Sequence, residues 1–336
     1  MIGTHSSWRE DREMADFGEI KSVDIREQWP NEAYDFTPWL AKNIDRLSDA
    51  LGMDLEVTAQ EADVGDFSLD LLAKDLGSGR LVVIENQFGA TNHDHLGKII
   101  TYAAGVDATA VVWLMESVRD EHRQALEWLN QRMDGEIHFF AVAIEVIRID
   151  GSRPAVQFRP VVYPNAWQNA ARETAEHQVS PRMEAYRRYF QIVIDELHEK
   201  HHFTRARVAQ PQSWHLFPSG VQGIGYGASF AQGDRARIDL YIDQGDAEMN
   251  KALFDSLAAQ RTDIERELGE SLEWERLDDK RASRIALYRE GHIELPEEEL
   301  CEIRAWMIEH ILRLKQILGP RLAQEEQNIV AGAASV

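Results

Sequence analysis

Two acidic residues and an amide on neighbouring predicted strands are the side chains best placed for chemistry. Residues 65–87 read GDFSLDLLAKDLGSGRLVVIENQ, with Asp70 in the first strand and Glu85 and Gln87 near the end of the second. The GlySerGly segment at 77–79 predicts a tight turn, so the two strands should form an antiparallel hairpin. Alternation of side chains puts Glu85 and Gln87 on one face, about 7 Å apart. Asp70 is then expected opposite Glu85 or Gln87, on strands about 4.8 Å apart.

This arrangement predicts a site for a hard divalent cation. Two carboxylates that lie so close repel each other, and Mg²⁺ or Mn²⁺ removes that cost by accepting their oxygens. Such an ion can polarise a phosphodiester, activate water and stabilise the leaving oxygen. Gln87 can position the water or a phosphate oxygen, although it carries no positive charge. Asp66 shares the face of Asp70 but lies roughly 13 Å away along a straight strand, so we expect it to be a turn or supporting residue.

The helix predicted at 93–104 brings further candidates to the same place. Lys98 lies one turn before Tyr102, and its long side chain can reach back over Gln87. Lys98 as a plain surface charge on an amphipathic helix is the competing interpretation. The sequence His-Asp-His that ends at His95 resembles a metal pair, but successive helical residues do not share a face, which favours a helix-start cluster.

One more acidic residue precedes the first predicted helix. Glu32 is either an additional acidic ligand or, as turn chemistry favours, part of the turn at 29–32. In the second half, Arg205 and Arg207 lie in HFTRARVAQPQSW and form the best local basic patch of the chain. They are weak candidates for phosphate contacts.

The elements that must position these residues alternate between strands and helices, which predicts an α/β unit with a mixed sheet followed by an α+β unit. Strands are expected at 20–27, 54–61, 67–74, 80–88, 108–115, 137–149, 155–163, 214–217, 225–230, 237–242, 272–276 and 284–288. Helices are expected at 37–51, 93–104, 119–133, 182–201, 247–268 and 296–318. Residues 1–18 are expected to be a disordered lead, 164–181 a linker and 321–336 a flexible tail, around domains at 19–163 and 182–320.

The first unit resembles the PD-(D/E)XK nuclease superfamily. An Asp that ends a Gly-containing strand, a hairpin, and an apolar strand that finishes Glu-x-Gln carry the resemblance, together with FTPWLAKNIDRL, VIENQFGATNHDHLGKIITYAAG and VVWLMESVRDEHRQALEWLN. The second unit is similar to a C-terminal bacterial domain of unknown function, through YRRYFQIVIDEL, FPSGVQGIGYGASF, RIDLYID and LEWERLDDKRASRIALYRE.

The resemblance implies a restriction-endonuclease-like mixed sheet flanked by helices, with Asp70 and Glu85 as metal ligands. Gln87 then occupies the position where the superfamily usually has lysine, and Lys98 is the replacement that the chain offers. As a catalytic set the resemblance therefore implies Asp70, Glu85, Gln87 and Lys98, with Mg²⁺ or Mn²⁺ as the cofactor.

Composition and charge limit these expectations. The chain has 336 residues and a formal net charge of -22, which argues against a basic coat for DNA and predicts weak or salt-sensitive binding through a small patch plus metal. We find no apolar run of bilayer length and no secretory signal, and the chain contains one cysteine. These features predict a protein of the reducing cytoplasm that does not associate with a membrane.

The sequence thus predicts a cytoplasmic Mg²⁺- or Mn²⁺-dependent nuclease. It favours an endonuclease over an exonuclease and DNA over RNA without deciding either, and defence against foreign DNA is an analogy alone. A homodimer is among the expected assemblies. Two rivals stay open. One is an inactive nuclease fold that binds nucleic acid or protein, with Gln87 marking lost chemistry; the other is a regulatory protein whose acidic surface contacts a partner.

Overall fold

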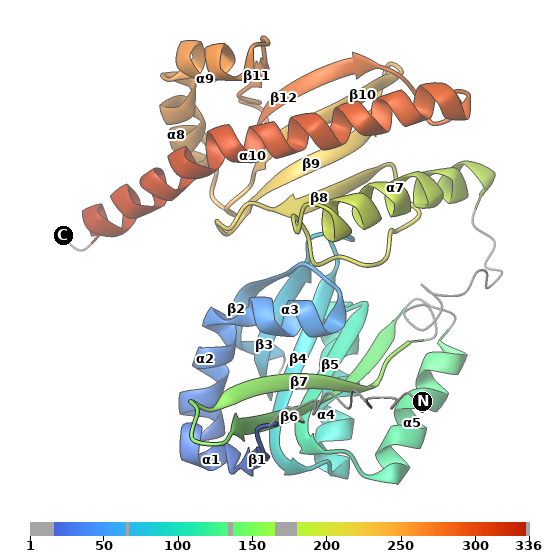
Figure 1. Ribbon diagram of the computed structural model, residues 1–336, viewed down its shortest axis with the longest axis vertical. Coiled ribbons are helices and arrows are strands. Elements are labelled where there is room, and N and C mark those ends of the chain that lie inside the picture. Colours follow the sequence, from blue (N-terminus) through green and yellow to red (C-terminus); the bar gives the residue numbers. More distant parts are fainter. Residues whose placement is uncertain (1–16, 65–66, 134–136, 165–179, 334–336) are drawn as a thin grey trace, which may run out of the picture.

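The computed structural model describes residues 17–64, 67–133, 137–164 and 180–333. The expected lead at 1–18 and the expected linker at 164–181 therefore lie largely outside the described residues, and Asp66 lies outside them as well. Within the described ranges the protein is a mixed α/β structure. A curled mixed sheet with helices on its faces precedes a second, antiparallel sheet and a long C-terminal helix (Figure 1).

The first sheet has seven strands in the order β1-β6-β5-β4-β3-β2, with β7 also paired to β6. The strands are β1 (Ile20–Val23), β2 (Leu55–Val64), β3 (Phe67–Asp75), β4 (Leu81–Ala90), β5 (Ala110–Ser117), β6 (His138–Ile149) and β7 (Ala155–Val162). Strands β4, β5 and β6 run parallel, and the remaining pairs are antiparallel. The crossovers between the parallel strands place helices against the sheet.

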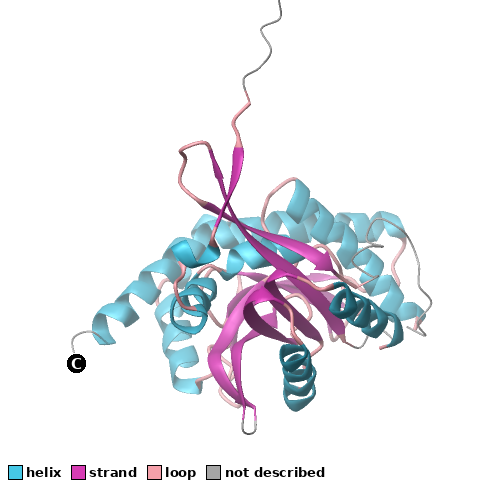
Figure 2. Cartoon of the chain, turned by 90° about the horizontal axis from the view of Figure 1, so that it is seen from below, coloured by secondary structure: helices cyan, strands magenta, loops and turns pink. Residues whose placement is uncertain are grey.

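Helices cover both faces of this sheet. They are α1 (Ile25–Gln28), the π-helix η1 (Glu32–Phe36), α2 (Thr37–Lys42), α3 (Ile44–Leu51), α4 (His93–Val106) and α5 (Asp120–Arg132). One core lies under η1, α2 and α3 and includes Phe36, Leu40 and Leu47. A second core lies under α4 and α5 and includes Ile99 and Leu126. The ends of β1, β6 and β7 extend beyond these layers (Figure 2).

The second sheet has five antiparallel strands in the order β11-β12-β10-β9-β8. They are β8 (Trp214–Pro218), β9 (Ile224–Ala231), β10 (Arg235–Ile242), β11 (Glu273–Glu275) and β12 (Ser283–Glu290). The helices of this half are α7 (Pro181–Glu199), α8 (Ala247–Ala258), α9 (Arg261–Leu268) and α10 (Glu297–Ala333). All four contribute to one apolar core with the sheet. In the described residues, no helix combines the length and apolar character that a bilayer crossing requires.

Four predicted elements differ from the structure, and each difference has a local cause. The predicted strand 20–27 ends at Val23, because Asp24 accepts a hydrogen bond from Arg26 N at 2.8 Å and caps a helical turn. The predicted helix 37–51 is interrupted at Asn43, whose side-chain amide donates to Trp39 O at 2.8 Å.

The other two differences lie in the second half. The predicted helix 247–268 divides into α8 and α9 at Gln260, whose N–H donates to Leu257 O and so tightens the chain. The final helix was predicted to end at Leu318 and instead continues through Pro320 to Ala333. Leu318 and Leu322 are both buried in the core, and their packing offsets the backbone hydrogen bond that proline removes.

A buried carboxylate joins the two halves. Asp54, at the start of β2, accepts hydrogen bonds from the Thr204 hydroxyl and, at 2.9 Å, from Arg205 N. Only 2% of Asp54 is exposed, and burial raises its pKa. Arg207 N donates to Gly52 O at 3.0 Å beside it. The start of β2 and the chain after α7 therefore form one contact.

We expect Asp54→Ala to lower the free energy of unfolding by about 1–3 kcal/mol, because the buried Thr204 hydroxyl and Arg205 N–H lose their acceptor. Urea denaturation followed by circular dichroism measures the loss. Asp49→Ala is the matched control at the same junction. The Asp49 side chain is 65% exposed and pairs with Arg205, so its loss should cost less than about 1 kcal/mol. Equal losses for the two variants would contradict this assignment.

Candidate functional site

The candidate site lies at the point where the backbone pairing between β3 and β4 ends. Pairing between the two strands runs from Lys74↔Leu81 to Leu71↔Ile84. Beyond that point the Asp70 carboxylate, not the Asp70 backbone, accepts the Asn86 N–H at 2.7 Å. This register puts Asp70 level with Glu85, one of the two alternatives that the hairpin left open.

A break in strand alternation accompanies this change. Leu71 packs in the core under α2 and α3, whereas Leu69 packs in the core under α4 and α5. Residues two apart in a regular strand share a face, so β3 is irregular at Asp70. Glu61, which lies between the paired residues of β2 opposite Asp70, has a φ of 50°. Burial raises the pKa of Asp70 most, and the negative charge of Glu61 adds a smaller contribution to the same shift.

Glu85 and Gln87 supply buried oxygens that have no partner among the described residues. Both lie on β4 two residues apart, and they are 3% and 6% exposed. Glu85 Oε2 and Gln87 Oε1 accept no hydrogen bond from the described residues, while Gln87 Nε2 donates to Ala90 O at 2.9 Å. Buried acceptors of this kind are costly unless a donor or a cation meets them.

The carboxylates perturb one another strongly. Burial and then the charge of Asp70 raise the pKa of Glu85, and Lys98 opposes the shift, with a net pKa of about 8. Burial also raises the pKa of Asp70. Two carboxyl groups that share a buried space cannot both ionise at low cost, and a cation between them removes the penalty.

Glu32 belongs to the same cluster, which the turn interpretation did not predict. It opens η1, and its carboxylate accepts the Phe88 N–H at the end of β4. Burial raises the pKa of Glu32, and the charge of Asp70 adds to the shift. A carboxylate from the helical layer thus reaches the end of the strand that carries Glu85.

Helix α4 brings a cation and an imidazole to the carboxylates. Lys98 is exposed, and its charge lowers the pKa of Asp70, Glu85 and Glu32. His95 Nε2 lies 3.9 Å from Glu85 Oε1, and burial followed by the charge of Lys98 lowers the pKa of His95. The charge of Lys98 therefore acts on three carboxylates of this cluster, and its role over the end of β4 stays a prediction.

Tyr102 has a structural contact at the same corner. It is 1% exposed, and its hydroxyl donates to Ser68 O at 2.9 Å. Burial, together with the charges of Glu85 and Asp70, raises the pKa of Tyr102. Tyr102 thus ties α4 to β3 two residues before Asp70, which holds the two sides of the site together.

Three further residues take part that the sequence did not single out. Asn86 is fully buried, gives its backbone N–H to Asp70, and donates its side-chain amide to Thr37 Oγ1 at 2.8 Å. Arg26 lowers the pKa of Glu32 and donates to Glu116 Oε1 at 3.0 Å. Glu116 also accepts the Gly89 N–H at 2.7 Å. Asn86 could have been identified from the sequence, because it is a polar residue at the end of the apolar run in VVIENQ. No sequence pattern indicated Arg26 or Glu116.

The remaining sequence candidates lie elsewhere. Arg205 donates through Nε to Asp49 at 2.9 Å, and its Nη2 lies 3.8 Å from Asp45, so the guanidinium already has acidic partners. Arg207 packs against Gly52, where an added Cβ would lie 2.3 Å from Arg207 Cγ. Both arginines therefore belong to the junction between the halves, away from the carboxylate cluster.

The donor set fits a cation that keeps part of its water shell. Among the described residues, no three His, Cys, Asp or Glu side chains form a ready-made ligand group. Mg²⁺ is commonly held by one or two carboxylates and retains several waters. Asp70 and Glu85, with the partnerless oxygen of Gln87 beside them, suit such an ion better than they suit zinc, which prefers four protein ligands.

Comparison with known proteins yields one family and one solved structure. Residues 185–322 match the family described as a domain of unknown function, DUF4268. The match runs from α7 to α10 and so covers the second sheet. No curated protein matches the chain. SfsA of Pyrococcus furiosus, solved in complex with Ca²⁺, aligns with a TM-score of 0.23 and 13% identity over 37% of this chain and 59% of its own. A likeness of that size defines neither the fold nor the function here.

Proposed function

We propose that the first half of the chain is a PD-(D/E)XK-type nuclease that requires Mg²⁺ or Mn²⁺. The observation that carries this proposal is the Asp70–Glu85 pair. The two carboxylates lie at the point where β3 leaves β4, and Glu85 keeps a buried oxygen that no described residue satisfies. Burial and the like charge of Asp70 hold the pKa of Glu85 near 8. An ionised Glu85 therefore destabilises the metal-free fold, and a bound cation would remove that destabilisation.

Each residue then has a stated role. A divalent cation held by Asp70 and Glu85 would supply a Lewis acid that polarises a phosphodiester and lowers the pKa of water. Gln87 Oε1 can accept a hydrogen bond from the attacking water. The ammonium of Lys98 can contact the phosphate charge that grows as the new P–O bond forms and the bond to the leaving oxygen breaks. Glu32 and Asn86 hold the end of β4 in place.

The proposed substrate is DNA, contacted through a small surface. The chain carries a net charge of -22, so nucleic-acid binding must depend on local cations such as Lys98 and Arg26 together with the metal. We expect this binding to weaken steeply with salt. We assign a targeting or assembly role to the second half, place the protein in the reducing cytoplasm, and retain defence against foreign DNA as its setting.

A nuclease fold that binds without cleaving is the second candidate. Gln87 stands where the superfamily usually has lysine, and its amide nitrogen donates to Ala90 O within the same strand end. In that case a nucleic acid or a protein would bind at the same corner, and cleavage would be absent with every metal.

A cleavage screen tests the proposal. Single- and double-stranded DNA and RNA are incubated with Mn²⁺ or Mg²⁺, and we expect the wild type to cut DNA. Asp70→Asn should lower the rate by about 100-fold or more, because it removes charge that the cation needs. Asp279→Asn is the matched control, since Asp279 is an exposed residue of the second half. Metal-dependent stabilisation without cutting of any substrate would favour the binding fold.

A further inference from the structure

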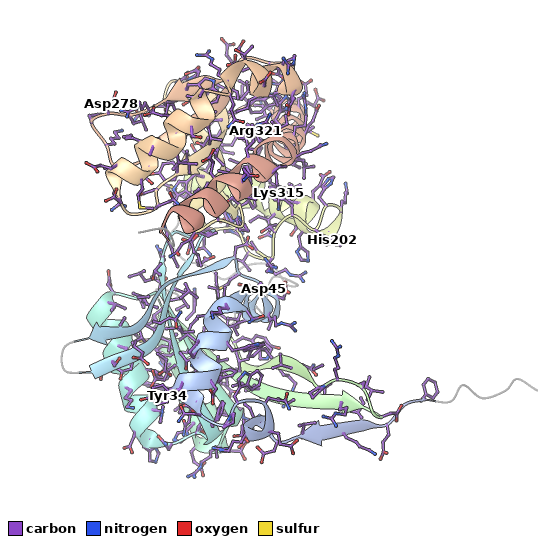
Figure 3. All side chains as sticks on the ribbon, turned by 90° about the vertical axis from the view of Figure 1, so that its left-hand side faces the viewer. Tyr34, Asp45, His202, Asp278, Lys315 and Arg321 are labelled. Carbon is purple, nitrogen blue, oxygen red and sulfur yellow. The ribbon has the colours of Figure 1, made fainter. Side chains whose placement is uncertain are left out.

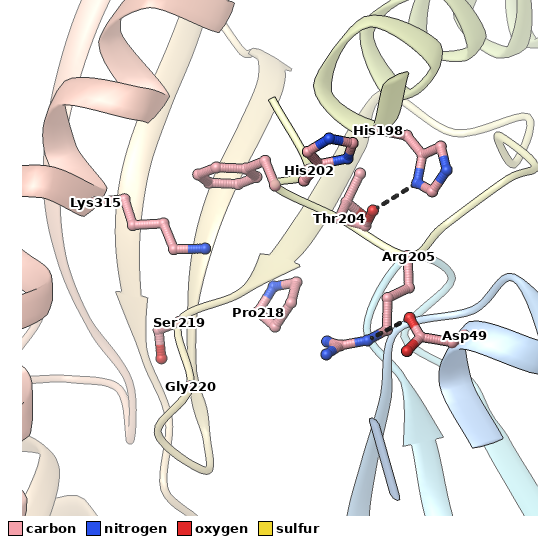
Figure 4. A pocket seen from close by; sticks show the side chains of 10 residues that line it. Asp49, His198, His202, Thr204, Arg205, Pro218, Ser219, Gly220 and Lys315 are labelled. Carbon is pink, nitrogen blue, oxygen red and sulfur yellow. Dashed lines mark hydrogen bonds and ion pairs between the residues drawn. The ribbon is translucent and has the colours of Figure 1, made fainter. Parts of the chain in front are cut away.

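A cavity of about 350 Å³ lies at the junction of the two halves, away from the carboxylate cluster. Its walls come from α3, the chain after α7, the turn between β8 and β9, and α10 (Figure 4). Side chains from both halves of the chain therefore meet in one hollow. Its volume falls in the range of small-molecule sites, about 300–1,000 Å³.

Two basic side chains face this cavity. Lys315 of α10 is half-buried with its Nζ 4.3 Å from the centroid of the Phe203 ring, and it makes no ion pair with a carboxylate of the described residues. Arg205 approaches from the other side, where Asp49 holds it (Figure 4). Burial lowers the pKa of Lys315, the charge of Asp54 opposes that shift, and the charge of Arg205 adds to it. Like charges that face one space are stabilised when an anion lies between them.

Two histidines complete the polar lining. His198 Nδ1 lies 2.8 Å from Thr204 O, so that nitrogen donates and the ring is held in one orientation. His202 lies three residues after the end of α7 and has a φ of 49°; His202 N donates to His198 O, and Phe203 N donates to Leu197 O. This is the helix-ending position that usually carries glycine. A non-glycine residue with a positive φ carries backbone strain, and such strain clusters at functional sites.

We propose that this cavity binds a phosphate-bearing small molecule of about nucleotide size. Lys315 lies on α10, His198 on α7, and His202 and Arg205 on the segment after α7, and these four groups match the several oxygens of a phosphate better than the two of a carboxylate. Asp49 is the one carboxylate of the lining, and Arg205 already pairs with it. A metal cation would be repelled here, and a purely apolar ligand would leave these polar groups unpaired.

The proposal is independent of the proposed nuclease function, because its residues lie outside the carboxylate cluster. Figure 3 shows His202 and Lys315 near Asp45, at the level where the two halves meet. Since the bound phosphate would touch both halves, it would also strengthen their junction. Ligand binding should therefore appear as a rise in the stability of the full chain.

Thermal unfolding of the full chain with inorganic phosphate and with adenosine monophosphate, each compared with sodium chloride at equal ionic strength, tests the proposal. We expect at least one phosphate probe to raise the unfolding midpoint of the wild type. Lys315→Gln should weaken binding about tenfold or more. Lys280→Gln makes the same charge change beside Asp278, which Figure 3 places at the far side of the second half, and should bind like the wild type.

His202→Gly separates binding from folding. Glycine relieves the positive φ, so this variant should unfold at a higher temperature without ligand and still bind phosphate more weakly than the wild type. Absence of any phosphate effect in the wild type, or equal losses in Lys315→Gln and Lys280→Gln, overturns the proposal. So does a phosphate effect that Glu85→Ala removes, or a Lys315-dependent response seen only with duplex DNA that lacks terminal phosphates.

Discussion

Without metal and above about pH 8, Glu85→Gln should be more stable than the wild type, by on the order of 5 kcal/mol. The folded protein raises the pKa of Glu85 from 4.5 to about 8, so the native state binds the proton more tightly than the unfolded chain does. The stabilisation from that proton is fully present below the unfolded pKa and is lost as pH rises through about 8. Glutamine keeps a neutral side chain of the same size at every pH.

Urea denaturation in EDTA at acidic, neutral and alkaline pH measures this effect. The wild-type stability should fall relative to Glu85→Gln as pH increases, and Glu127→Gln, an exposed change on α5, should follow the wild type. With Mn²⁺ the order should reverse, because the cation displaces the proton and stabilises the wild type alone. Parallel stability curves for wild type and Glu85→Gln would show that Glu85 carries no buried charge.

Lys98→Met should reduce cleavage by about 100- to 1,000-fold and leave the Mn²⁺-induced stabilisation in place. The ammonium of Lys98 acts on three carboxylates of the site and lies on its exposed side, where a phosphate would approach. Methionine preserves length and helix propensity while it removes the charge. Since Lys98 also lowers the pKa of Glu85, the remaining activity should need a higher pH.

Single-turnover cleavage rates and a metal titration separate the two effects of this substitution. Lys42→Met is the control, because Lys42 is an exposed lysine of α2 in the same half of the chain. If Lys98→Met cuts at the wild-type rate, Lys98 is an ordinary surface charge, which is the competing interpretation of the helix. If metal binding is lost as well, Lys98 supports the carboxylates and not the phosphate.

The hairpin that carries the site could be predicted from sequence because several local signals agree on it. Gly79 has a φ of 72°, as the predicted turn requires, and alternating apolar residues on both sides of the turn fix the faces. The resulting register places Asp70 level with Glu85. Lys98 became a candidate from local sequence as well, since one helical period relates it to Tyr102 on α4.

Parts of the site that depend on contacts between distant segments were not predictable. Arg26 was assigned to a strand, and only the capping carboxylate of Asp24 turns that segment into a helix. Glu61 faces Asp70 through an irregularity in β2 that no residue pattern announces. Arg205 looked like part of a basic patch because its acidic partners, Asp45 and Asp49, lie about 160 residues earlier.

The hydrogen bond between Asp54 and Thr204 limits how one half of this protein can be exchanged for another in evolution. The acceptor belongs to one half and its donors to the other, so neither half presents a self-sufficient surface when it is separated. A truncated chain that ends after β7 would leave an ionisable group facing solvent that is otherwise 2% exposed. Exchange of one half by recombination should therefore succeed only when the residues at 54 and 204 are inherited together.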